Sequence, residues 1–478
     1  MKYLKKTHFF LSILSIPTSK VSRLGIFLNY KLILFERQSM RFIFLTPVLL
    51  TFAAFSADNS DLLLERYQNA CNSVVNQHGL APGDMEVLEI LRDDLHDWNS
   101  SNDELDTLAA ELQLTLWIGD NELADELFHL LIATQLDNPA IGLAWSRFAL
   151  ELPDADEEAI FGELISLYPT SPKVVLDWAI QLDKQNRYSQ ARNAIDGLDV
   201  EERLKPDVIG VYADLLFADN RFKEAIAELD QADATTLTAN PAQKASLEIK
   251  RTRYNSIDKK WEDELAIRES EAEMDDLPRV LMITSRGPII LELYEDHAPN
   301  TVANFISLAE SGYYDGMSFH RVIPKFMVQG GDPISRDKTS TQSGTGGPGY
   351  TIRDEHTGED IRYHFAGSLS MAKTAAPNSG GSQFFLTHLP TSHLDGRHTV
   401  FGRILDGLEI ARAIEKGDEI LTVTVIRKRE HEYLPEKLGP NGQPLIESTL
   451  EDLIDTSKTV KPILDKSRKP SLNSSSNQ

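Results

Sequence analysis

The sequence predicts a multidomain α and β protein, with an N-terminal all-α solenoid of helical repeats and a C-terminal domain rich in short strands. Residues 58–275 contain few glycines, and their leucines and alanines recur at helical spacing. Two short apolar runs, 280–284 and 288–293, then flank a Ser-Arg-Gly turn, which is a hairpin pattern. At 478 residues the chain is long enough for two or three domains.

The N-terminal segment 1–56 contains a pattern typical of a signal peptide. Met40-Arg41 precedes an apolar run over 42–55, and Ala54-Phe55-Ser56 offers small residues for cleavage. The run is shorter than the roughly 20 residues that cross a bilayer, so we expect export of the protein without a stable membrane anchor. A buried helix or an anchor extended by preceding residues are the alternatives. Residues 1–39 form a dubious extension, since Met40 could be the true start.

Charge is unevenly distributed along the chain. Most of the net charge of −25 lies in residues 58–278. Such a surface repels nucleic acid and anionic membranes and favours basic partners, although a solubilising helix surface gives the same pattern. The only cysteine, Cys71, excludes an intramolecular disulfide and a cysteine cluster for zinc.

The helical region repeats itself with a period of 34 residues. A set of eight residues recurs one period later: Pro172, Trp178, Ala179, Leu182, Asn186, Arg187, Tyr188 and Ala191 correspond to Pro206, Tyr212, Ala213, Leu216, Asn220, Arg221, Phe222 and Ala225. Paired helices at this period resemble tetratricopeptide repeats. One pair cannot bury its own apolar face, so several must stack. A plain helical bundle is the alternative.

The C-terminal part continues with alternating elements. Pro299 begins an expected amphipathic helix that ends near Gly312, and residues 408–414 form a second one. Residues 367–371 and 399–401 are strand-like, and a charged helix over 261–276 precedes the whole domain. The tail, 429–478, is polar and is expected to be partly disordered.

Two motifs in this domain are highly specific. The first is Phe-His-Arg over 319–321, followed by Phe-Met-x-Gln-Gly-Gly-Asp over 326–332, and the second is Gly-Ser-Gln-Phe-Phe over 381–385. Together they resemble the active-site segments of the cyclophilins, the peptidyl-prolyl cis-trans isomerases. The resemblance covers 279–428 and implies an eight-stranded antiparallel closed β-barrel capped by two helices.

The resemblance also implies a role for each site residue. The catalytic set would be Arg321, Phe326, Gln329, Phe385 and His398. The substrate-binding set would be His320, Met327, Ala372, Lys373, Gln383, Leu394 and His393. A glycine-rich loop, 344–347, would border the groove. Each residue taken singly could instead be a core or surface residue, but the strings match jointly in order and spacing. No cofactor and no metal are expected; three histidines at 388, 393 and 398 lack a metal-binding spacing.

Departures from the family pattern occur at His393, at Lys373 and as one extra residue between Met371 and Gln383. His393 stands where many members have a tryptophan implicated in cyclosporin binding, which puts strong inhibition by that drug in doubt. Lys373 stands where asparagine is common. A short loop over 311–316 is similar to that of bacterial members, so the expected destination is the bacterial periplasm.

The sequence therefore favours an exported isomerase that assists folding of other exported proteins. Its partners would be proline-containing polypeptides, with clients or a protein partner on the helical repeats, and not nucleic acid. The alternative is a proline-binding chaperone or assembly adaptor with little turnover. A third interpretation is a scaffold protein whose function resides in the helical repeats, with the C-terminal domain incidental.

Overall fold

The structure, a computed structural model, describes residues 63–70, 84–100, 105–232, 240–358 and 361–445. The chain divides after Trp178 into two compact units, 1–178 and 179–478. The expected signal segment, Cys71 and the tail beyond 445 lie outside the described residues. None of the helices in the described ranges is both long enough and apolar enough to cross a membrane.

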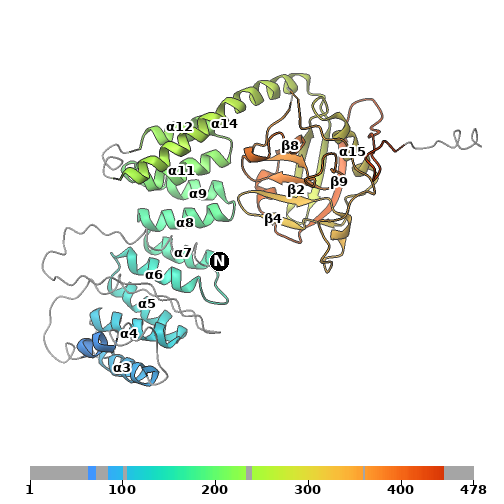
Figure 1. Cartoon of the computed structure of the whole chain (residues 1–478). Helices are drawn as coiled ribbons and strands as arrows, with labels where there is room; N and C mark the ends of the chain where they lie inside the picture. Colours follow the sequence, from blue (N-terminus) through green and yellow to red (C-terminus); the bar gives the residue numbers. More distant parts are fainter. Residues whose placement is uncertain (1–62, 71–83, 101–104, 233–239, 359–360, 446–478) are drawn as a thin grey trace, which may run out of the picture. The chain divides into compact units, whose positions relative to one another are not determined.

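The first unit consists of helices that each pack against the next one (Figure 1). After the helical residues 63–70 come α3 (Asp84–Asn99), α4 (Leu105–Ile118), α5 (Asn121–Thr134), α6 (Pro139–Ala149) and α7 (Glu157–Leu167). Side chains of Asp120, Asn138 and Asp156 accept hydrogen bonds from N–H groups in the first turns of α5, α6 and α7. These caps satisfy donors that a helix start leaves without a partner.

The second unit begins inside α8 (Pro172–Lys184) and continues through α9 (Tyr188–Asp196), α10 (Val200–Arg203), α11 (Pro206–Ala218), α12 (Phe222–Asp230) and α14 (Pro241–Met274). The starts of α8 and α11, and those of α9 and α12, keep the period of the sequence repeat. Asn186 and Asn220 occupy the two equivalent turns with φ of 63° and 61°, a left-handed conformation that asparagine tolerates. The identity of the pairs as tetratricopeptide repeats stays a prediction.

Helix α14 is 34 residues long, so the charged helix expected over 261–276 is only its C-terminal half. Its buried side chains are Leu247, Tyr254, Ile257, Glu264 and Glu271. It begins after Asn240, whose side chain accepts from the Gln243 N–H, and ends at Asp275 in a left-handed conformation.

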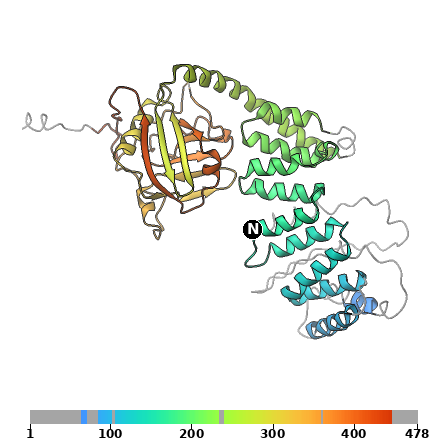
Figure 2. The ribbon, with the colours of Figure 1, turned by 180° about the vertical axis from the view of Figure 1, so that it is seen from behind.

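The C-terminal domain is a curled antiparallel sheet of nine strands (Figures 1 and 2). The strands are β1 (Arg279–Thr284), β2 (Gly287–Leu293), β3 (Met317–Ser318), β4 (Arg321–Ile323), β5 (Met327–Gly330), β6 (Ser368–Met371), β7 (Phe384–Thr387), β8 (Val400–Asp406) and β9 (Glu419–Arg427). Their order is β3-β9-β1-β2-β8-β6-β7-β5-β4.

The expected count of eight strands was therefore one too low. The extra strand arises because residues 317–323 form two short strands, β3 against β9 and β4 against β5. The chain changes partner between them at Phe319 and His320. The two ends of the sheet order are thus consecutive in sequence.

Two helices accompany the sheet, as expected. They are α15 (Pro299–Glu310) and α16 (Leu408–Arg412), and the short 3₁₀ helices η2 (Pro333–Arg336) and η3 (Ser392–Leu394) lie in the loops. Phe305 of α15 is buried, with its ring 5.4–5.6 Å from Phe401 and Phe384. Beyond β9, Tyr433 and Leu438 are also buried, so the described start of the C-terminal segment packs on this domain.

Candidate functional site

The sheet register brings the main site residues onto one line across four strands. Arg321 of β4 pairs with Gln329 of β5, Gln329 pairs with Phe385 of β7, and Phe385 pairs with Ser370 of β6. Paired residues of an antiparallel sheet project to the same face. Arg321 and Gln329 of the first motif and Phe385 of the second therefore share one face.

A chain of side-chain hydrogen bonds runs along this line. Arg321 Nη1 donates to Gln329 Oε1 at 3.3 Å, and Gln329 Nε2 donates to Gln383 Oε1 at 2.9 Å. Gln383 Nε2 in turn donates to the carbonyls of Gly344 and Gly346, at 3.0 and 2.9 Å. The guanidinium of Arg321 is exposed to solvent, so it is held in place and still accessible to a ligand.

The glycine-rich loop is fixed by a carboxylate that the sequence motif contains. Asp332 accepts from the N–H groups of Gly344 and Gly346. A Cβ on Gly346 would lie 2.2 Å from Asp332 Oδ1, so only glycine fits there. The loop is thereby held against Gln383.

Apolar side chains lie around Phe385. Phe385 is 4% exposed, and the ring of His398 meets its ring edge-on at a centroid distance of 5.5 Å. Met327 is buried, and Phe326 is half-buried with its ring 5.3 Å from that of the exposed His393. The sheet and the loop of η3 thus bring together an apolar ring face and the exposed guanidinium of Arg321.

The remaining expected residues lie at the edges of this group. The Ala372 N–H donates to the Gln383 carbonyl at 2.9 Å. Lys373 is tied to Asp354 Oδ2 at 2.6 Å, and Leu394 is half-buried at the end of η3. His320 is half-buried beside Gly344, and burial lowers the pKa of its imidazole.

His398 is oriented by the backbone. Its Nδ1 lies 3.0 Å from the Met371 carbonyl, which accepts the Nδ1 proton. Burial lowers the pKa of His398, against the raising effect of that hydrogen bond. The ring is therefore neutral near pH 7, and a neutral ring is suited to packing beside Phe385.

Sequence reasoning missed the polar residues that lie behind the ring of Phe385. His364 stacks on Phe385 with ring centroids 5.9 Å apart and an interplanar angle of 5°. Its Nδ1 donates to Asp395 Oδ1 at 3.0 Å, and its Nε2 lies 3.0 Å from Ser370 Oγ. Burial lowers the pKa of His364, while Asp395 opposes that shift. No local spacing announces these residues, because each comes from a different loop or strand.

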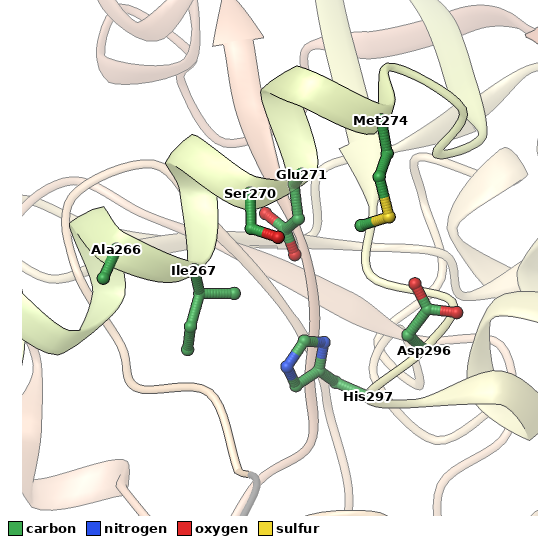
Figure 3. Close-up of a pocket in the computed structure, with 7 residues that line it drawn as sticks. All are labelled: Ala266, Ile267, Ser270, Glu271, Met274, Asp296 and His297. Atoms are coloured by element: carbon green, nitrogen blue, oxygen red, sulfur yellow. The ribbon is translucent and has the colours of Figure 1, made fainter.

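A shallow hollow of about 460 Å³ lies elsewhere in the second unit. It is lined by α14 residues and by Asp296 and His297 (Figure 3). None of the expected site residues lines it. Its polar lining residues are Ser270, Glu271, Asp296 and His297, which do not belong to the line from Arg321 to Gln383.

Comparison with known proteins identifies the family of the C-terminal domain. The family model "Cyclophilin type peptidyl-prolyl cis-trans isomerase/CLD" matches residues 279–430. A "Peptidyl-prolyl cis-trans isomerase" of Synechococcus elongatus is 47% identical over 152 residues, which cover 31% of this chain and 97% of that protein. "Peptidyl-prolyl cis-trans isomerase B" of Bacillus subtilis is 52% identical over 144 residues, 30% of this chain and 94% of that protein.

A solved structure is also similar. It is a cyclophilin-type isomerase of Cryptosporidium parvum in the presence of the dipeptide Ala-Pro. It is 31% identical, covers 31% of this chain and 98% of its own, and gives a TM-score of 0.28.

Proposed function

The chain belongs to the cyclophilin-type peptidyl-prolyl cis-trans isomerases, and on that premise we propose that Arg321 stabilises the twisted prolyl amide of its substrate. Rotation about an X-Pro bond has a barrier of about 18–20 kcal/mol, because it breaks amide resonance. A catalyst must bind the twisted amide more tightly than either planar form. In the twisted form the prolyl nitrogen gains a lone pair, and a permanent cation with N–H donors matches it.

The observation that carries the proposal is the pairing of Arg321, Gln329 and Phe385 on one line of the sheet. An apolar ring on this line would hold the proline ring, and the adjacent guanidinium would donate to the prolyl nitrogen. Gln329 orients the guanidinium, since its Oε1 accepts from Arg321 Nη1.

The magnitude requires more than one residue. A charge-assisted hydrogen bond contributes roughly 1.5–3 kcal/mol, which is about tenfold to a hundredfold in rate. An acceleration of about 10⁵ needs about 7 kcal/mol. Residues that hold the peptide must supply the rest, and Gln383, Ala372 and Lys373 would line the groove for residues that precede proline.

A protease-coupled assay of a short proline peptide tests the mechanism. We expect Arg321→Ala to lower kcat/KM at least tenfold, and Arg321→Lys to recover little, because lysine lacks the planar fork. Arg397→Ala, which removes another exposed arginine of the same domain, should leave turnover unchanged. Wild-type rates in Arg321→Ala would sink the mechanism. Peptide binding without turnover in the wild type would favour the proline-binding adaptor.

We also propose that the protein is exported and that its helical part binds clients or a partner. The pattern over residues 40–56 supports export, to a bacterial periplasm. The mature N-terminus of the protein tests it: a first residue after Ser56 is expected, and a chain that still begins at Met1 or Met40 would contradict export.

The client role needs a separate measurement. Removing residues 58–171 deletes the helices up to α7 and leaves α8 and everything after it. Short-peptide turnover should persist, while acceleration of the refolding of a proline-limited protein should fall. Equal performance on the protein substrate would refute a client-binding role of those helices.

A further inference from the structure

In the proposed proline pocket Phe326 would form one wall and Phe385 the floor, and the Phe326 side is attached to a helical turn of the second unit. Lys325, which directly precedes Phe326, has φ of 59°, a left-handed conformation that an L residue with a long side chain rarely adopts. Its N–H donates to Asn186 Oδ1 at 2.6 Å, and its Nζ forms an ion pair with Asp183. Asn186 lies in the turn between α8 and α9, and Asp183 lies in the last turn of α8.

A series of hydrogen bonds also connects the Phe326 backbone to the same turn. The Phe326 carbonyl accepts from the His388 N–H at 3.0 Å, and the His388 carbonyl accepts from Arg412 Nε at 3.2 Å. Arg412 is 3% exposed, and its own carbonyl accepts from Asn186 Nδ2 at 3.3 Å. Asn186 therefore binds both Lys325, which precedes Phe326, and Arg412, which holds His388.

Arg412 reaches the next repeat as well. Its Nη1 donates to Asp219 Oδ1 and its Nη2 to the Ala218 carbonyl, both at 2.7 Å. One residue further, Asn220 accepts from the Ala366 N–H at 2.9 Å and donates to the Ala366 carbonyl at 3.2 Å. The two equivalent repeat turns thus bind main-chain groups of the isomerase domain.

A third helical contact leads to the ring of Phe385. Lys260 Nζ of α14 donates to Asp395 Oδ2 at 2.9 Å. The other oxygen of Asp395 accepts from both the N–H and the Nδ1 of His364, each at 3.0 Å. His364 is the residue that stacks on Phe385.

We propose that Asn186 and Lys260, two residues of the helical part, are positioning residues of the isomerase. Asn186 acts through Lys325 on the Phe326 wall, and Lys260 acts through Asp395 and His364 on Phe385. The proposal rests on the proposed function, because it concerns the same pocket. It makes residues 179–274 part of the catalytic unit, and it leaves the turns at Asn186 and Asn220 engaged and unavailable to clients.

The contacts favour positioning over mere docking for a geometric reason. An interface that only joined two parts could use any surface of the barrel. Here two of the helical contacts lead to the expected site: Asn186 binds the residue before Phe326, and Lys260 reaches Phe385 through Asp395 and His364. Sub-ångström displacement of such groups changes how well a proline ring is held, and it alters turnover without unfolding the domain.

The test uses the full chain and a short proline peptide. Asn186→Gly keeps the left-handed turn and removes the amide, so kcat/KM should fall about threefold to tenfold, mainly through KM, because the wall contacts proline in the ground state too. Asn186→Asp retains the acceptor for the Lys325 N–H and should recover most of the loss. Lys260→Met should lower kcat/KM by a similar factor.

The matched control is Lys259→Met, which removes the same charge from the exposed neighbour on α14 and should leave KM and kcat unchanged. Melting temperatures are measured in parallel. If Asn186→Gly has a lower melting temperature than the wild type, the kcat/KM of Lys260→Met is used to test the proposal. The inference is overturned if both variants keep kcat/KM within about twofold of wild type at unchanged melting temperature. If Arg321→Ala does not reduce turnover, the proposed mechanism is overturned instead.

Discussion

Glu264 of α14 and Arg362 of the segment before β6 form an ion pair that solvent does not reach. The distance between Arg362 Nη2 and Glu264 Oε1 is 2.7 Å, and the two side chains are 1% and 2% exposed. Arg362 also pairs with Glu271, and its guanidinium lies 3.5 Å from the centroid of the Tyr294 ring. The helix is thereby joined to the isomerase domain by charges with no access to water.

Arg362→Met should destabilise the protein severely, because it leaves Glu264 and Glu271 buried without their cation. Breaking one side of a buried pair costs about 3–5 kcal/mol. Urea denaturation of the full chain measures the free energy of unfolding. Arg221→Met provides the comparison, since it breaks an exposed pair with Glu224 that contributes about 1 kcal/mol or less. Similar losses in both variants would contradict the argument.

Acid should weaken the same junction. Although burial opposes it, hydrogen bonds from Arg362 hold the pKa of Glu264 below its usual value. Its stabilising contribution is thus fully present above the unfolded pKa of about 4.3 and is lost as pH falls through the lower folded pKa. In Glu264→Gln the free energy of unfolding should fall less steeply as the pH is lowered. An unchanged pH dependence would contradict this role of Glu264.

Stability should also depend on His388 at mildly acidic pH. Burial, aided by Arg412, lowers the pKa of His388 to about 4. Between about pH 4 and the unfolded pKa of about 6.5, the unfolded chain binds a proton that the folded chain does not. The free energy of unfolding should therefore rise with pH across this window, by on the order of 3 kcal/mol, and stay level above it.

His388→Leu tests that assignment by denaturation at several pH values. The slope between about pH 4 and 6.5 should become smaller than in the wild type, while other buried histidines such as His364 keep part of it. An identical slope would show that His388 does not titrate in this window.

Gln329→Ala should slow the enzyme without unfolding it. The variant loses the acceptor for the Arg321 guanidinium and the neutral donor to Gln383, and a typical hydrogen bond contributes about 0.5–1.5 kcal/mol. The expected fall in kcat/KM is about twofold to tenfold. Gln329→Glu keeps the acceptor for Arg321 and should be less impaired. Equal kcat/KM in all three proteins would exclude an orienting role.

Gly331→Ala should destabilise the site by at least about 2 kcal/mol. Gly331 has φ of +83°, and a Cβ there would lie 2.3 Å from the Ser382 carbonyl oxygen. Gly347→Ala is the control, since nothing lies within 4 Å of its Cβ position. Thermal melting of both variants checks the difference; a stable Gly331→Ala would mean that the backbone adapts there.

The repeat pattern made the helix pairs predictable, and the full length of α14 was not. The positions of α8, α9, α11 and α12 follow from residues recurring at a fixed period. In α14 the inward positions after Ile257 are Glu264 and Glu271, whose partner Arg362 is remote in sequence. Carboxylates at buried positions hide the apolar periodicity by which an amphipathic helix is recognised.

The site shows the same division. Arg321, Gln329 and Phe385 were predictable because they lie in two compact motifs. His364, Asp395 and Lys260 were not, because each is an ordinary polar residue until the fold brings it to its partner. The strand count differed for a similar reason: the change of partner after Ser318 depends on where β9 and β5 lie.

The shared register of β4, β5 and β7 has a consequence for how this enzyme can fail. Side chains alternate between the two faces of a strand, so slipping β5 by a single position would turn Gln329 inward or outward together with its whole strand. Partial misalignment would therefore yield no half-active form. In a refolding mixture, turnover of a proline peptide would therefore report the fraction of chains with the correct strand register. Chains with a shifted register would be inactive.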